Sequence, residues 1–181
     1  ATSFVRGVED KLYAGNYSAA YEQLDLTSFA DFWLIQEIMM NSEMKHPKSV
    51  YMYLNRGTIY AGPIWDFDWN TLPVSTSYAE EGYSYTKSML EKAKPYHKRS
   101  GYPNEPIEDD DKNYVWYPML VADPSFQDMA ASRWSKMLPI LTVYAEEIDS
   151  TAKRIAASWE HNNAIWPAYY SAKSDRQKYC N

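Results

Sequence analysis

The sequence predicts an α+β fold that is mostly helical and holds one small β-hairpin. Helical patterns cover residues 27–40 and the region after Asp123, and a short alternating segment rich in β-forming residues lies between them. A chain of 181 residues fits one domain of roughly 100–200 residues. Hydrophobic residues make up 45% and charged residues 23% of the chain, which is typical of a globular protein. We therefore expect residues 1–181 to form a single domain.

The first third of the chain is expected to be helical. Residues 3–14 predict a short amphipathic helix that ends near Gly15. Asp25 and Thr27 are both candidates for the N-cap of the next helix. The stretch SFADFWLIQEIMMN that follows is apolar on almost every side, as in a helix buried at the centre of a domain. We expect residues 27–40 to form this core helix.

A β-hairpin is predicted directly after a polar loop. Residues 50–54 alternate and are rich in β-formers, and residues 58–64 form the second predicted strand. The linking Asn55-Arg56-Gly57 predicts a three-residue loop with a type I turn and a bulge. Because a hairpin returns the chain to its start, the stretch after it should lie near the beginning of the first strand.

The long region between the hairpin and Asp123 shows little periodicity. Residues 71–114 are polar and tyrosine-rich, with a short helix expected around residues 86–93. Connections of this length inside a domain are uncommon and are often functional.

The last third is expected to hold two helices. Asp123 predicts an N-cap, and Pro124 occupies the first helical position. Pro139 is expected to separate this helix from a longer one, in which apolar residues recur every three or four positions. Trp166 and Pro167 should end the second helix.

Composition excludes several classes of protein. The net charge is −6 and no basic stripe is present, which argues against nucleic acid as a partner. Apolar runs fall far short of the roughly 20 residues of a transmembrane helix, so no transmembrane segment is predicted. The three histidines do not share a metal-ligand spacing, and a single cysteine cannot form an internal disulfide.

The acidic motif is the segment PIWDFDWN at residues 63–70. Alternate residues of an extended segment face one way, so Asp66, Asp68 and Asn70 should share one side. Its aromatic residues should then anchor the turn to the core helix. Carboxylates buried unpaired are costly, and this donor set suits a hard cation such as Mg²⁺. An alternative is that the acids only cap local turns. An EF-hand is not expected, because Ser77 stands where its bidentate glutamate belongs.

A second acidic position lies in the loop that leaves the core helix. Glu43 precedes the hairpin and Asp66 follows it, so the hairpin should bring the two residues together. Phosphoryl transfer needs one carboxylate to orient the attacking hydroxyl and another to hold a metal on the phosphates. The alternative is an exposed, solvated loop glutamate, which is the usual fate of such a residue.

These residues resemble a known family. The stretch NSEMKHPKSVYMYLNRGTIYAGPIWDFDWN at residues 41–70 resembles the signature region of the CotH family, named for spore coat protein H. That region reads Asn-x-Asp, a tyrosine-rich strand, a hairpin, then Gly-Pro-x-Trp-Asp-Phe. The later ADPSFQDMAASRWSKML and the Asn-Asn-x-x-Trp-Pro ending are also similar. The resemblance covers roughly residues 22–167.

The resemblance implies a kinase-like fold, because CotH proteins are regarded as atypical, secretory-pathway-like kinases. This chain would then be kinase C-lobe-like and form the C-terminal lobe of a longer CotH-like protein. The resemblance makes Asp66 the metal ligand, with Asp68 and Asn70 as auxiliary ligands, and Glu43 the catalytic general base or positioning acid. Ser49 would close the catalytic loop and bind the cofactor. The implied cofactors are ATP and Mg²⁺ or Mn²⁺.

The sequence departs from the family pattern at two points. The family usually has Asp where this chain has Glu43, and a carboxylate misplaced by an ångström can cost ~10²-fold in rate. A Phe-Gly pair is replaced by Trp69-Asn70-Thr71. In addition, no β-rich nucleotide lobe precedes residue 22, so we expect the N-lobe of the same protein as a partner. The 181 residues alone are expected not to turn over ATP efficiently.

Three functions follow as hypotheses. The first is metal-dependent phosphoryl transfer to a protein hydroxyl, with a protein substrate or a coat or cell-surface partner. The resemblance implies an exported or cell-surface location. The second is a pseudokinase that acts only as an interaction module, which the glutamate at position 43 favours. The third is a carbohydrate-binding module built from the rings of residues 71–117. We expect most tryptophans to lie in the core instead.

Overall fold

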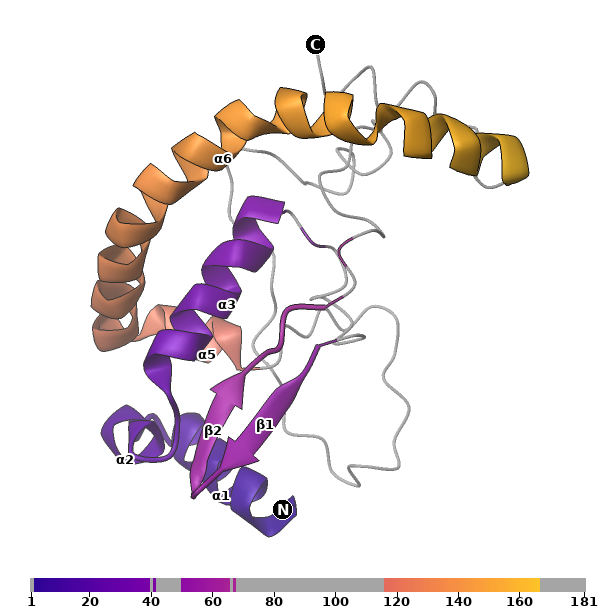
Figure 1. The fold of residues 1–181 in the computed structure, drawn as a ribbon. Coiled ribbons are helices and arrows are strands. Elements are labelled where there is room, and N and C mark those ends of the chain that lie inside the picture. The colour runs from indigo at the N-terminus through magenta and orange to yellow at the C-terminus, as the bar shows by residue number, and fades with distance from the viewer. Residues whose placement is uncertain (1, 40, 42–49, 66, 68–115, 167–181) are drawn as a thin grey trace, which may run out of the picture. The chain divides into compact units, whose positions relative to one another are not determined.

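The computed structural model describes residues 2–39, 41, 50–65, 67 and 116–166 (Figure 1). In chain order the elements are α1 (Thr2–Tyr13), α2 (Tyr17–Tyr21), α3 (Leu26–Met39), β1 (Met52–Asn55), β2 (Thr58–Ala61), α5 (Tyr117–Ala122) and α6 (Pro124–Ile165). The predicted α+β, mostly helical class is confirmed. The chain divides into two compact units, Ala1–Trp134 and Ser135–Asn181.

Helix α1 ends as the sequence predicts. Gly15 adopts a positive φ of 69°, where a side chain would be strained. The Asn16 N–H donates to the Lys11 carbonyl at 2.9 Å, and the Gly15 N–H donates to the Leu12 carbonyl at 3.0 Å. These two bonds form a Schellman motif, which satisfies carbonyls that the end of the helix leaves open.

Helix α3 is the predicted core helix, displaced by one residue at each end. Asp25 is its N-cap, because its carboxylate Oδ1 accepts a hydrogen bond from the Ser28 N–H at 2.7 Å. Thr27, the other candidate, lies inside the helix. Phe29, Ala30 and Phe32 are buried, which agrees with the apolar character of this segment.

The core of the first unit joins residues from every element except β1. Its largest members are Val8 and Leu12 of α1, Phe29 and Phe32 of α3, Ile59 of β2, Trp116, Tyr117 and Leu120 at α5, and Phe126 of α6. The Tyr117 ring lies 6.2 Å from Phe32 and 6.0 Å from Phe29 between centroids. Burial raises the pKa of the Tyr117 hydroxyl well above its usual value. Helix α5 was not predicted, because a helix of six residues is too short to show a periodic pattern.

The hairpin is present, but its loop is shorter than predicted. Strands β1 and β2 are antiparallel, and Asn55 pairs with Thr58, which leaves a two-residue loop. Arg56 and Gly57 have φ values of 49° and 85°, and positive φ at both central residues is characteristic of a type I′ turn. The predicted three-residue loop was therefore wrong. The type I′ turn matches the twist of the two strands, and Asn55 can then remain in the ladder.

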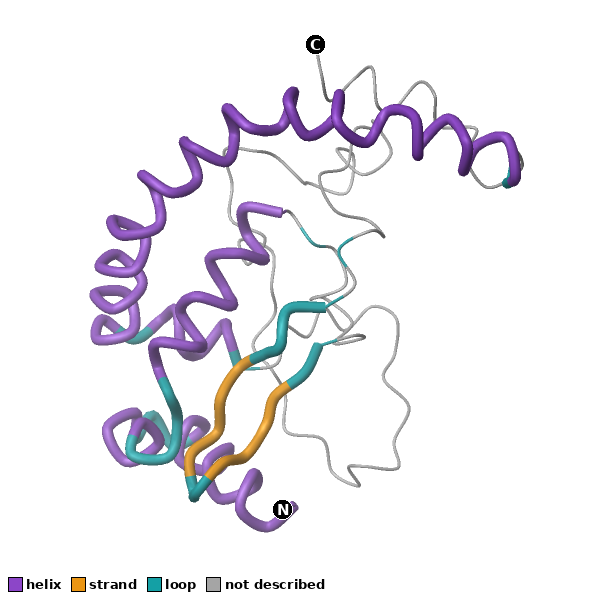
Figure 2. The backbone as a smooth tube through the Cα atoms, in the orientation of Figure 1, coloured by secondary structure: helices purple, strands orange, loops and turns teal. Residues whose placement is uncertain are grey.

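Strand β2 runs beside β1 in the hairpin (Figure 2), and it is hydrogen-bonded on its other side as well. Beside its ladder with β1, the Ile59 N–H donates to the Gln23 carbonyl, and the Asp25 N–H donates to the Ile59 carbonyl, each at 2.9 Å. The Ala61 N–H donates to the Ser28 hydroxyl of α3 at 3.1 Å. These bonds hold β2 against the beginning of the core helix.

Helix α6 is continuous from Pro124 to Ile165, so the predicted break at Pro139 was wrong. Proline removes one N–H donor and crowds the preceding turn, but the turns on both sides keep their own hydrogen bonds. The helix ends at Ile165, before Trp166, as the sequence predicts. Its beginning is also as predicted, with Pro124 as the first helical residue.

Asp123 links the beginning of α6 to α2. Its Oδ2 accepts a hydrogen bond from the Phe126 N–H at 3.2 Å, which confirms the predicted N-cap. The same oxygen accepts the Tyr21 hydroxyl at 2.7 Å. Burial, and then the hydrogen bond and negative charge of Asp123, raise the pKa of Tyr21 above its usual range.

Removing this hydroxyl gives a prediction that depends on pH. Tyr21→Phe is expected to lower the free energy of unfolding by about 1–2 kcal/mol at neutral pH, because it removes a hydrogen bond to a carboxylate. The folded state raises the pKa of Tyr21, so this contribution is complete below the ordinary tyrosine pKa of about 10 and is lost at higher pH. Urea denaturation of both proteins between neutral and alkaline pH should show the difference closing above about pH 10.

The matched control is Tyr53→Phe, which removes a hydroxyl from a side chain that is 51% exposed. We expect it to change stability by no more than about 0.5 kcal/mol. A constant difference between wild type and Tyr21→Phe across the pH range would contradict the assigned hydrogen bond.

Candidate functional site

The predicted site residues lie outside the described part of the chain. This is true of Glu43, Ser49, Asp66, Asp68 and Asn70, and also of the predicted helix at residues 86–93. Their roles and positions therefore stay predictions. The structure does describe residues that border them, namely Asn41, Val50, Trp65 and Phe67.

The first border is the end of the core helix. The Asn41 N–H donates to the Gln36 carbonyl at 3.1 Å, just after α3 ends at Met39. The Gln36 and Asn41 side chains are only 2% and 3% exposed. The chain is therefore still anchored in the core two positions before Glu43.

Gln36 was not among the predicted site residues. Its Oε1 is buried, and no hydrogen-bond partner is found for it within the described segments. A buried amide oxygen without a partner is costly, so an amide in this position is unusual for a helix that only packs. The sequence signal was a glutamine that stands, with Glu37, in the otherwise apolar stretch FWLIQEIMM.

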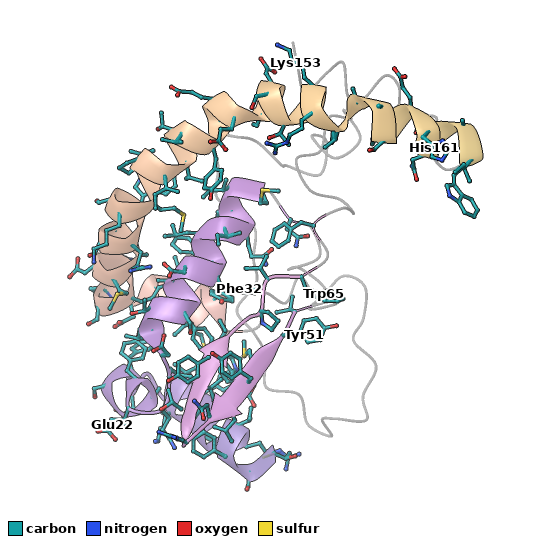
Figure 3. The ribbon with its side chains drawn as sticks, viewed as in Figure 1. Glu22, Phe32, Tyr51, Trp65, Lys153 and His161 are labelled. Carbon is teal, nitrogen blue, oxygen red and sulfur yellow. The ribbon has the colours of Figure 1, made fainter. Side chains whose placement is uncertain are left out.

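The second border is the open end of the hairpin, opposite its turn. The Gly62 N–H donates to the Tyr51 carbonyl at 2.9 Å, one position beyond the last ladder pair, Met52 and Ala61. The rings of Tyr51 and Trp65 then meet edge to face, with centroids 6.2 Å apart (Figure 3). The hairpin does return the chain to its start, as predicted, and it brings Tyr51 beside Trp65.

The aromatic side chains around the acidic motif are more exposed than expected. Trp65 is 57% and Tyr51 is 47% exposed, so Trp65 does not anchor the turn to the core helix. Trp134 and Trp166 are also exposed, and Trp116 is buried. Trp33 packs against the core, but the expectation that most tryptophans lie in the core does not hold for the described residues, because Trp65, Trp134 and Trp166 lie at the surface.

The rings proposed for carbohydrate binding are only partly described. Trp116 is 3% exposed and Tyr117 is fully buried, so neither can present a ring face to a sugar. The remainder of the predicted region, residues 71–115, lies outside the described residues.

The described residues contain neither a cluster of metal-binding side chains nor a membrane-spanning helix. None of the described histidine, cysteine, aspartate and glutamate side chains gather in groups of three or more that could hold a metal ion. Likewise, no helix in the described segments is both long enough and apolar enough to span a membrane. The predicted ligands Asp66, Asp68 and Asn70 lie outside the described residues.

The described part of the chain holds a core helix and a tight hairpin after it, and the sequence places an acidic segment beyond the second strand. The family model described as CotH kinase protein matches residues 1–179, and this chain therefore belongs to the CotH kinase family. The match is longer than the roughly 22–167 covered by the resemblance in sequence. No curated protein and no solved structure matched the chain.

Proposed function

We propose that the protein containing this domain transfers a phosphoryl group from ATP to a hydroxyl group of a protein substrate. The proposal assigns Asp66, with Asp68 and Asn70, to the metal, Glu43 to the acceptor hydroxyl and Ser49 to the nucleotide. Membership of the CotH kinase family supports the kinase-like class. The residue roles rest on the match of residues 41–70 to the family's signature region.

The observation that carries the proposal is the contact between Tyr51 and Trp65. Ser49 lies two positions before Tyr51, and Asp66 follows Trp65 directly. Since the two rings are in contact, the segments that hold these two residues begin from the same end of the hairpin. Asn41 is buried, so the segment that contains Glu43 starts from a position that is fixed in the core. This arrangement supports a shared site for the loop and the acidic motif.

The donor set fits the proposed metal. Two carboxylates and an amide oxygen at alternate positions are hard oxygen ligands, as Mg²⁺ and Mn²⁺ prefer. When bound, the ion would neutralise charge on the phosphate oxygens. Asp66 would hold the ion, and Glu43 would orient the acceptor hydroxyl and accept its proton.

The proposal also covers partners and location. A kinase binds its nucleotide with a β-rich lobe, and the described residues hold only the two-stranded sheet and one parallel bridge. We therefore assign that lobe to another part of the same protein. The family is named for a spore coat protein, which favours an exported protein or a coat or cell-surface partner.

The test is transfer from γ-labelled ATP with Mg²⁺ or Mn²⁺, using the full-length protein and its Asp66→Asn variant. We expect label on a protein acceptor with the wild type and a loss of at least ~10³-fold in the variant, because the metal position loses its charged ligand. The matched control is Asp128→Asn, an equal change on an exposed side chain of α6, which should keep full activity. Residues 1–181 alone should give background.

The opposite result would favour the pseudokinase. Equal background from the full-length wild type and Asp66→Asn, with both proteins folded, would reject phosphoryl transfer. The glutamate at position 43 is the observation that favours this second function, since the family usually has aspartate there. The acids would then only stabilise the turn, and the domain would serve as an interaction module.

A further inference from the structure

We propose that the outer edge of β1 binds an extended segment of the acceptor protein through backbone hydrogen bonds, as an added strand. The outer edge consists of the backbone N–H and C=O groups of Met52 and Leu54. The identity of the partner as the acceptor rests on the proposed phosphoryl transfer. The edge itself is defined by the geometry of the hairpin alone.

The pairing register determines which backbone groups of β1 face away from β2. Asn55 is the last residue of β1 before the two-residue loop, and residues beside such a loop exchange both hydrogen bonds with their partner. Bonded and non-bonded pairs then alternate along antiparallel strands. Leu54 and Met52 therefore occupy non-bonded positions, and their N–H and C=O groups point away from β2. Their cross-strand partners are Ile59 and Ala61.

Strand β2 confirms this alternation, because its own outward groups have partners on its other side. The Ile59 N–H donates to the Gln23 carbonyl at 2.9 Å. The Ala61 N–H donates to the Ser28 hydroxyl at 3.1 Å. Both residues therefore direct their N–H groups away from β1, as the non-bonded positions require.

Strand β1 has no such second neighbour among the described residues. Their sheet contains two strands in the order β1-β2, so β1 is an edge strand. Its side chains are also accessible, with Tyr53 51% and Leu54 47% exposed. The backbone groups of an open edge are a template on which another strand can pair.

The sequence of β1 lacks most of the features that protect an edge strand. Natural edges often carry lysine, proline, an inward-pointing charge or a bulge. Residues 50–55, VYMYLN, contain no charged residue and no proline. The register runs from Met52 to Asn55 without a bulge. An exposed edge of this kind is suited to strand addition, in which backbone hydrogen bonds hold an extended peptide.

The size of the edge favours a transient partner over a second copy of the chain. Strand β1 has four residues and extends for roughly 13 Å at about 3.3 Å per residue. A stable protein complex buries about 1,200–2,000 Å² in total, and one edge of this length supplies only a fraction of that area. A substrate must leave after each turnover, so a small contact suits an acceptor.

The position of the edge relates it to the candidate site. Beyond Met52 the chain of β1 leads to Tyr51, whose ring lies 6.2 Å from that of Trp65 between centroids. Ser49 precedes Tyr51 by two positions, and Asp66 follows Trp65 directly. A segment paired with β1 therefore runs along the hairpin to the open end, where the stretches with the proposed nucleotide and metal ligands begin. Backbone pairing would orient acceptor hydroxyls in different sequences.

The experiment uses the full-length protein, γ-labelled ATP and dephosphorylated casein as an unfolded acceptor that contains serine. Leu54→Pro removes the outward N–H and spares the ladder, because proline is tolerated where the N–H of an edge strand faces away from its neighbour. We expect it to raise KM for casein at least about tenfold, with less than about a twofold change in kcat, because one pairing hydrogen bond is lost. The matched control is Thr2→Pro at the first position of α1, where proline is also tolerated and KM should not change.

Leu54→Ala separates the backbone from the side chain. It keeps the outward N–H, so it should raise KM much less than Leu54→Pro. An equal effect of the two variants would overturn the inference, since the side chain would then make the contact. Equal KM values for the wild type and Leu54→Pro would overturn it as well and leave the proposed function standing.

Binding of labelled casein without ATP distinguishes this inference from the proposed function. Binding that Leu54→Pro weakens, without phosphoryl transfer by the wild type, would support the edge as a docking site and reject the proposed function. Absence of binding would overturn the inference, because backbone pairing does not depend on the sequence of the partner. A dimer that Leu54→Pro dissociates would assign the edge to a second copy, which also overturns it.

Amide hydrogen exchange of the wild type decides the question if Leu54→Pro does not fold. Casein should slow exchange of the Met52 and Leu54 amides at least about tenfold, because these amides would enter a new ladder. The Tyr53 amide already faces β2 and should change less. Unchanged exchange at Met52 and Leu54 with casein bound would overturn the inference.

Discussion

Replacing Glu43 with aspartate in the full-length protein is expected to raise the rate of phosphoryl transfer by up to ~100-fold. Aspartate is one methylene shorter and is the residue that the CotH family usually has at this position. The shorter side chain would move the carboxylate by about an ångström to the position that the family's aspartate takes, and rates fall steeply with misplacement of that size. Initial rates with γ-labelled ATP at saturating substrate would measure the effect on kcat.

Two variants control this experiment. Glu22→Asp removes the same methylene from an exposed side chain at the end of α2 and should leave the rate unchanged. Glu43→Gln keeps the length but removes the charge, so it should lower the rate below that of the wild type. If Glu43→Asp and Glu43→Gln both match the wild type, the carboxylate at position 43 takes no part in transfer.

The largest loss of stability is expected from Phe29→Ala in the core helix. Phe29 is fully buried, and its ring lies 6.2 Å from Trp116 and 6.0 Å from Tyr117 between centroids. The substitution removes these contacts and leaves a cavity where α3 meets α5. Such changes cost about 3–5 kcal/mol, a large part of the stability of an average domain.

Urea denaturation would measure this loss for wild type and variant. Leu54→Ala on β1 is the control, because Leu54 is 47% exposed and its removal should cost less than about 1 kcal/mol. Equal midpoints for Phe29→Ala and wild type would show that the cluster of Phe29, Trp116 and Tyr117 does not hold the first unit together.

The parts of the fold that the sequence predicted best depend on local signals. Gly15 ends α1 because its positive φ is a property of the glycine itself. Asp25 and Asp123 cap α3 and α6 through hydrogen bonds to N–H groups only three residues away. Such interactions need no knowledge of the remainder of the chain.

The features that the sequence did not predict depend on the surroundings of a residue. Pro139 was expected to end a helix, yet helical turns on both sides keep α6 continuous. Helix α5 is too short to show a period, and Tyr117 is recognisable as a core residue only when α3 is placed beside it. Trp65 and Trp116 are the same residue type and gave the same expectation of burial, yet Trp65 is exposed and Trp116 is buried.

The features of the candidate site also divide into those that local sequence predicted and those that depend on tertiary packing. The motif at residues 63–70 could be identified from residue types and spacing alone, and the return of the hairpin toward Tyr51 followed from its turn. The distance between Glu43 and Asp66 depends instead on two segments that only tertiary packing can orient. Gln36 was missed for a similar reason, since its burial becomes evident only in the folded core.

The double hydrogen bonding of β2 makes the two strands of the hairpin unequal in local opening. β2 is bonded to β1, to the segment around Leu24 and, through Ala61, to Ser28 of α3, whereas β1 is bonded only to β2 among the described strands. Separation of the hairpin therefore frees β1 first and leaves β2 docked. Trp65 would then stay attached to the docked strand β2, while Tyr51 would move away with β1. If Asp66 holds the metal and Ser49 the nucleotide, as proposed, the metal side of the site follows the strand that should exchange more slowly, and the nucleotide side precedes the strand that should open at lower free energy.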